Sequence, residues 1–82
     1  MQLQTGMVIC ATAGKEQHGF YVVTAVEGRF VLIADGKRRP LSHPKRKNIR
    51  HIAPTSTVWD IGEMTDKTLR CKLREYTAKG GY

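Results

Sequence analysis

The sequence has only two cysteines, and neither lies in a pattern that would hold a metal ion. Cys10 and Cys71 are far apart, and neither has a second Cys or a His at ligand spacing beside it. A zinc site and a disulfide framework are therefore not expected. Two free thiols fit a reducing compartment, so we expect a cytoplasmic protein.

Long apolar runs are also missing. No run approaches the roughly 20 apolar residues that a membrane-spanning helix requires, so we expect no membrane partner. Residues 1–6 have neither the basic region nor the apolar region of a secretory signal, and no such signal is expected.

Residue types used in catalysis are present but not grouped. The carboxylates are scattered singly along the chain, so no acid and base pair can be named. Ser42, His43 and Cys10 are of the types found in nucleophilic catalysis, yet no recognised spacing links them. We therefore expect a protein that is not an enzyme and that binds no cofactor and no metal.

The composition that remains is that of one small basic domain. The chain has 82 residues, of which 40% are hydrophobic and 26% are charged, and its formal net charge is +7. This length allows a single modest core, and the charge is more typical of a nucleic-acid binder than of an enzyme.

The positive charge is concentrated in one internal stretch. Residues 36–59 hold seven of the fourteen Lys and Arg side chains and none of the seven acidic ones, so the rest of the chain is balanced. All seven lie within residues 36–52, which we call the basic segment. The candidate RNA-binding side chains of the segment are Lys37, Arg38, Arg39, His43, Lys45, Arg46, Lys47, Arg50 and His51.

The basic segment does not resemble a disordered tail. It lies inside the chain, and apolar or proline residues interrupt it at short intervals: Pro40, Leu41, Pro44, Ile49, Ile52 and, just beyond it, Pro54. Disordered basic arms usually lack such anchors, so we expect a basic loop fixed to a folded body. Nucleic acid is the commonest partner of such a surface, because Lys and Arg replace counterions along the phosphate backbone.

The hydrophobic pattern predicts several short strands followed by one helix. Strands are expected at residues 6–12, 20–26 and 29–34, with shorter strands at 48–53 and around 56–59. Both alternating sets of residues 20–26 are largely apolar, so this strand is expected to be covered on both sides. Gly28 and Gly36 mark tight turns, and Gly28 is expected to supply the positive φ of a hairpin.

A helical period replaces the strand pattern near the end of the chain. Thr65 is a candidate N-cap, Leu69, Leu73 and Tyr76 form one apolar stripe, and a helix is expected at about residues 66–78. Arg70 and Arg74 share another face, which we interpret as an ordinary solvated helix surface.

These elements predict a mainly β fold. Five short strands in about 60 residues favour a small barrel, because a flat sheet of this size would leave one apolar face uncovered. Residues 1–60 are expected to form the barrel, and residues 61–82 a C-terminal helix packed on it. Trp59 is expected to pack between the two.

The order of residues also resembles a known family. Residues 6–23, a strand, a glycine-bearing polar loop and a second strand, resemble the KOW motif. The continuation, with Asp-Gly-Lys at 35–37, Arg-Pro at 39–40 and Pro-Lys-Arg-Lys-Asn at 44–48, resembles the bacterial KOW-domain RNA-binding proteins. Those are similar to KOW-containing large-subunit ribosomal proteins of archaea and eukaryotes. The resemblance covers residues 5–53 and implies an SH3-like five-stranded barrel that binds RNA.

One residue of the KOW loop departs from the family pattern. The glycine expected there falls on His18, so either His18 adopts a positive φ or the neighbouring Gly19 does so. Lys15, in the same loop, is a further candidate RNA contact.

We therefore expect a monomeric RNA-binding protein, associated with the ribosome or translation, that grips phosphates of rRNA or another structured RNA. Two alternatives remain. An SH3-like barrel can serve as a protein-interaction module that docks on an acidic protein surface. Residues 44–47 also match a short basic nuclear import signal, although such matches are frequent by chance in basic proteins.

Overall fold

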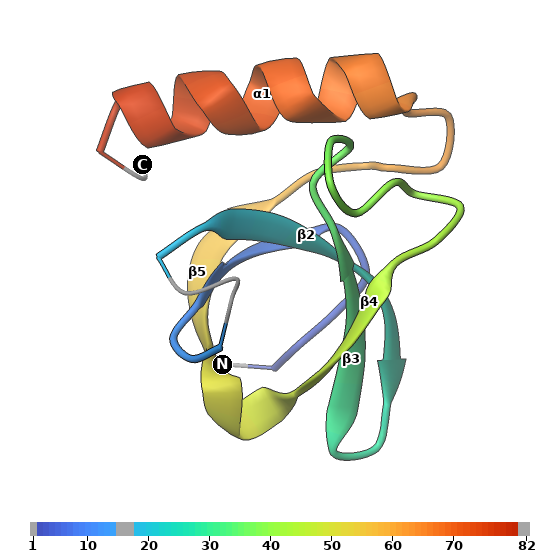
Figure 1. The fold of residues 1–82 in the computed structure, drawn as a ribbon, viewed down its shortest axis with the longest axis vertical. Helices are drawn as coiled ribbons and strands as arrows, with labels where there is room; N and C mark the ends of the chain where they lie inside the picture. Colours follow the sequence, from blue (N-terminus) through green and yellow to red (C-terminus); the bar gives the residue numbers. More distant parts are fainter. Residues whose placement is uncertain (1, 15–17, 81–82) are drawn as a thin grey trace.

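Five antiparallel strands and one helix make up the fold in the computed structural model, which describes residues 2–14 and 18–80 (Figure 1). In chain order the elements are β1 (Met7–Ala11), β2 (Phe20–Glu27), β3 (Phe30–Ala34), β4 (Lys45–Asn48), the 3₁₀ turn η1 (Ile49–His51), β5 (Ile52–Val58) and α1 (Asp66–Ala78). The strand order is β4-β3-β2-β1-β5, and the sheet curls into a small barrel with α1 across one side. This confirms the expected mainly β fold with a C-terminal helix.

Apolar side chains on both faces of the sheet form two adjoining parts of the core. Successive side chains of a strand point to opposite faces. Met7, Ile9 and Ala11 of β1 face the barrel interior, whereas Val8 between them faces α1. The interior part consists of Met7, Ile9, Ala11, Tyr21, Val23, Val31, Ile33 and Ile52, and the part beneath the helix includes Val8, Val22, Ala34, Leu69, Leu73 and Tyr76. As expected, β2 is covered on both sides.

The helix has the predicted bounds and the predicted buried stripe. The Thr65 hydroxyl caps it by accepting a hydrogen bond from the Thr68 backbone N–H. Leu69, Leu73 and Tyr76 are buried against the sheet. Trp59 packs edge-to-face on Tyr76, with ring centroids 5.8 Å apart, so its predicted position between barrel and helix is confirmed.

The predicted bounds of the last two strands were wrong. Residues 48–53 do not form one strand: β4 ends at Asn48, a 3₁₀ turn follows, and β5 begins at Ile52. The Asn48 side chain accepts a hydrogen bond from the Arg50 N–H and so caps the turn. Ile49 and His51, which the sequence interpretation placed on one face of a strand, instead lie in this 3₁₀ turn.

Two turn residues, Gly28 and His18, adopt positive φ values. Gly28, with φ 63°, makes the tight connection between β2 and β3, as expected. His18 has φ 73°, whereas Gly19 is not among the glycines with positive φ. His18, and not Gly19, therefore adopts the left-handed conformation. Lys15 of the same loop lies outside the described residues.

Among the helices of the described residues, none is long and apolar enough to cross a membrane.

Candidate functional site

The basic segment follows one edge of the barrel. It leaves β3, passes the N-terminal end of α1 as a loop, continues as β4 and ends in η1 at the opposite end of the barrel (Figure 1). In the part of the chain that the structure describes, β4 pairs only with β3 and forms an edge of the sheet, so one side of the strand faces away from the other strands.

A network of short hydrogen bonds fixes the start of this loop. Asp35 Oδ1 accepts hydrogen bonds from the backbone N–H groups of Lys37 and Arg39, both at 2.9 Å. The N–H groups of Asp35 and Gly36 in turn donate to the Arg39 carbonyl oxygen at 3.0 and 3.1 Å. The basic side chains at 37–39 therefore extend from a closed turn whose backbone is ordered.

Side chains in the first turns of α1 form hydrogen bonds to the same loop. Asp66 Oδ1 accepts a hydrogen bond from the Leu41 N–H at 2.8 Å, and Arg70 Nη1 donates to the Gly36 carbonyl oxygen at 2.9 Å. Gly36 has φ 75°, and a Cβ there would overlap the Asp66 carbonyl oxygen, so only glycine fits this close approach. The loop and the helix therefore form one unit.

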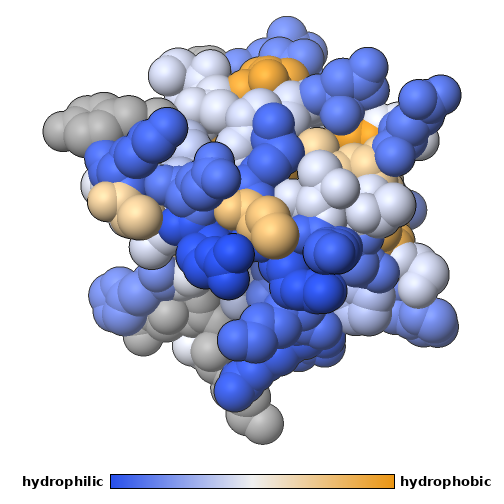
Figure 2. Space-filling model, turned by 90° about the horizontal axis from the view of Figure 1, so that it is seen from above, coloured by the Kyte–Doolittle hydropathy of each residue, from blue (hydrophilic) through white to orange (hydrophobic). Residues whose placement is uncertain are grey.

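Eight of the nine candidate side chains in the basic segment are at the surface, and we call these eight the basic face. Lys37, Arg38, His43, Arg46, Arg50 and His51 are exposed, whereas Arg39 and Lys45 are half-buried. Figure 2, which looks down on the α1 side of the molecule, shows strongly hydrophilic side chains over much of that side, with a few hydrophobic ones among them.

Lys47 is placed differently from the prediction. Its side chain is only 8% exposed, and its ammonium group donates a hydrogen bond to the Ala13 carbonyl oxygen at 2.7 Å. Lys47 pairs with Val31, whose side chain faces the barrel interior, and residues opposite each other in a sheet share a face. Lys47 thus joins β4 to the segment that follows β1, and it is not part of the basic face.

The far end of the basic face is ordered by an aromatic contact. The Arg46 guanidinium lies over the Phe30 ring, 3.8 Å from its centroid, a cation–π geometry that orients the side chain. A neighbouring pocket of about 320 Å³ is lined by Arg29, Asn48, Ile49 and Arg50. Arg29 comes from the β2–β3 turn and adds a cation that the sequence interpretation did not assign to the site.

Two arginines of α1 were not among the candidate site residues. Arg70 and Arg74 line a pocket together with Lys37, so the helix surface that had been interpreted as ordinary extends the basic face. Their i, i+4 spacing was visible in the sequence. What the sequence did not reveal is that the turn at Asp35 and Gly36 packs against this part of the helix.

The described residues offer no metal centre: no three His, Cys, Asp or Glu side chains gather within residues 2–14 and 18–80. Comparison of the sequence with protein-family models and with curated proteins gives no significant match.

Proposed function

We propose that this protein binds structured RNA through the basic face. The observation that carries the proposal is the combination of local charge and fixed backbone. The cations of residues 37–50 extend from a loop that hydrogen bonds to Asp35, Asp66 and Arg70 hold in place, and from an edge strand paired with β3. These two carboxylates bind backbone N–H groups of the loop, so they order the segment that carries the positive charge.

Such a surface suits the way duplex RNA presents itself. The major groove of A-form RNA is too narrow for side chains to read, so a small protein grips phosphates and 2′-hydroxyls and recognises shape before sequence. Arg38, Arg46 and Arg50 can donate bidentate hydrogen bonds to phosphates, whereas Lys37 and Lys45 act as point charges. Because the loop is already ordered, less conformational entropy is lost on binding.

The resemblance of residues 5–53 to bacterial KOW-domain RNA-binding proteins supports the same function. It also suggests the setting: a cytoplasmic, non-enzymatic protein associated with the ribosome or with translation, whose RNA is rRNA or another folded RNA.

Binding to a fully paired RNA hairpin tests the proposal. With about five phosphates neutralised, the logarithm of the affinity should fall with the logarithm of salt concentration with a slope of magnitude roughly 4 to 5. The double variant Arg38→Gln with Arg46→Gln should lower this slope by about 2 and weaken binding at least tenfold at low salt. The matched control changes two exposed lysines outside the basic face, Lys67→Gln in the first turn of α1 and Lys79→Gln at its C-cap, and removes the same charge.

If the two double variants lose RNA affinity equally, net charge alone explains the binding, and the proposal of a specific RNA-binding surface is overturned. An acidic polypeptide such as polyglutamate, added as a competitor, checks the alternative of a protein-interaction module. Displacement of RNA by polyglutamate at equal charge concentration would favour that alternative.

A further inference from the structure

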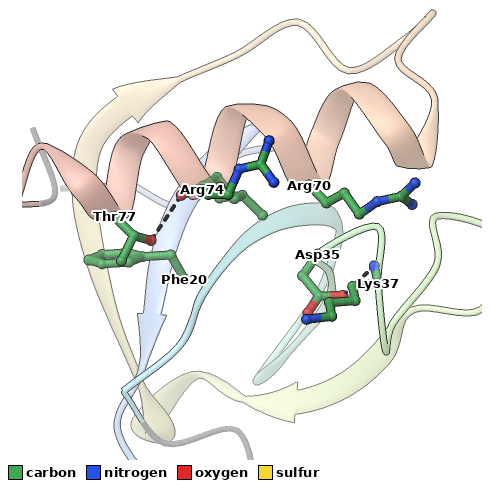
Figure 3. A pocket seen from close by; sticks show the side chains of 7 residues that line it. Phe20, Asp35, Lys37, Arg70, Arg74 and Thr77 are labelled. Atoms are coloured by element: carbon green, nitrogen blue, oxygen red, sulfur yellow. Dashed lines mark hydrogen bonds between the residues drawn. The ribbon is translucent and has the colours of Figure 1, made fainter.

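A pocket of about 380 Å³ opens between α1, the start of β2 and the turn after β3 (Figure 3). Its lining residues are Phe20, Asp35, Lys37, Arg70, Leu73, Arg74 and Thr77. Arg70 and Arg74 project from the helix, Asp35 and Lys37 lie on the turn opposite, and Phe20 lies below Thr77 at the other end. The volume is within the range of about 300 to 1,000 Å³ that is typical of small-ligand sites.

The pocket combines an apolar end with a positively charged end. Phe20 and Leu73 supply apolar surface, and Phe20 is held edge-to-face against Tyr76, with ring centroids 5.2 Å apart. Three cations, one carboxylate and the Thr77 hydroxyl complete the lining, which has an excess of two positive charges. The carboxylate is that of Asp35. Its Oδ1 already accepts hydrogen bonds from two backbone N–H groups of the turn in which Asp35 lies.

The two arginines differ in how they are held. Arg70 is oriented by its hydrogen bond to the Gly36 carbonyl oxygen. Arg74 is exposed and contacts the Cys71 sulfur at 3.9 Å, a weak interaction that a phosphate oxygen would replace at little cost. The Thr77 hydroxyl donates to the Leu73 carbonyl oxygen, so its own lone pairs are available to accept a hydrogen bond from a ligand N–H group.

We infer that this pocket binds one unpaired nucleotide, with the base against Phe20 and the phosphate between Arg74 and Lys37. An aromatic base with an attached phosphate matches both ends of the pocket, because bases stack on aromatic rings and arginine binds phosphate. Lys37 belongs to the basic face as well, so the pocket adjoins the surface proposed for duplex RNA. The inference rests on that proposed function and assigns a second element of the target: a bulged or flipped nucleotide beside the helix.

Three hairpins separate the contribution of the base from that of the phosphate. One is fully paired, the second carries a single unpaired adenosine, and the third carries an abasic residue at the same position, which keeps the phosphate and removes the base. The parent protein should bind the adenosine bulge about tenfold more tightly than the abasic bulge.

Variants of the pocket should remove this preference. Phe20→Leu keeps an apolar side chain but loses the aromatic face. Arg74→Gln removes a guanidinium whose hydrogen bond within residues 2–14 and 18–80 is the weak one to the Cys71 sulfur. Each should reduce the tenfold ratio to below threefold. Lys79→Gln, on the opposite side of α1 and outside this pocket, should leave the ratio unchanged. Urea denaturation of each variant checks that the fold is retained.

The outcomes distinguish failure of the inference from failure of the proposed function. A parent protein that binds all three hairpins equally, with the expected salt slope, binds RNA but does not use the pocket, and the inference is overturned. If no hairpin binds, the proposed function fails, and titration with adenosine 5′-monophosphate decides the inference. Amide shifts at Phe20, Leu73 and Thr77 with this nucleotide, but not with ribose 5-phosphate, would support a free-nucleotide site, and their absence would exclude it.

Discussion

The Asp66 carboxylate and the Leu41 backbone N–H, 25 residues apart in sequence, form a 2.8 Å hydrogen bond that joins the first turn of α1 to the basic loop. Asp66 also lies where a negative charge favours a helix, in the first turn. One side chain therefore stabilises both the helix start and the loop. This double role leads to the first prediction.

Asp66→Ala should lower the free energy of unfolding by about 2 kcal/mol, since it removes a charge-assisted hydrogen bond and a favourable first-turn charge. Urea denaturation measures the loss, and hydrogen exchange should accelerate at the Leu41 amide. The control is Glu63→Ala, which removes an exposed acid just before the helix and should change stability by less than about 0.5 kcal/mol. Similar losses in both variants would argue against the loop contact.

Lys47→Met should destabilise the fold by about 1 to 2 kcal/mol, because the Ala13 carbonyl oxygen loses its bond to the ammonium group. RNA affinity and its salt dependence should stay close to those of the parent. Lys45 lies on the same face of β4 as Lys47, opposite Ile33, but it is the first residue of the strand and its side chain is half-exposed. Lys45→Met should therefore show the reverse: little change in stability and a salt slope lower by about 0.9. If Lys47→Met loses RNA binding while keeping its stability, Lys47 belongs to the contact surface after all.

His18→Gly should stabilise the protein by about 0.5 to 1 kcal/mol. His18 has φ 73°, a conformation that costs an L-residue about 1 to 2 kcal/mol and that glycine adopts without that penalty. Thermal denaturation would show a raised midpoint. His51→Gly is the matched control, since His51 lies in η1 without positive φ, and there the added backbone entropy of the unfolded chain should lower the midpoint.

Leu69→Ala should cost about 3 kcal/mol, because Leu69 is fully buried between α1 and the sheet and its truncation leaves a cavity. Equilibrium unfolding followed by Trp59 fluorescence reports this loss, as Trp59 packs in the same part of the core. Lys67→Ala, on the exposed side of the same helix, should remain within about 0.5 kcal/mol of the parent. A loss at Leu69 as small as at Lys67 would contradict the packing of the helix.

Elements specified by local signals were predicted well. The helix needed only its cap at Thr65 and the stripe of Leu69, Leu73 and Tyr76, which are features of one short stretch of chain. The signals for the first three strands and for the tight turn at Gly28 are likewise local. The two apolar faces of β2 correctly predicted that this strand is buried on both sides.

The site itself was predicted only in part, because its geometry depends on contacts between distant residues. The composition located the charge in residues 36–52 but not the parity of β4, which turns Arg46 outward and Lys47 inward. The position of Arg70 beside the basic segment depends on a hydrogen bond to Gly36, 34 residues earlier in the chain. No periodic pattern encodes such a contact.

The joining of α1 to the loop through Asp66 and Arg70 has a thermodynamic consequence. A partner bound across the basic face and α1 binds only the docked arrangement, so its binding free energy is added to the stability of that arrangement. At a ligand concentration one hundred times Kd, the linkage amounts to about 2.7 kcal/mol. Binding at the surface would thus be measurable at a distance from it. The buried face of α1, with Leu69 and Tyr76, would separate from the sheet less often when the partner is bound.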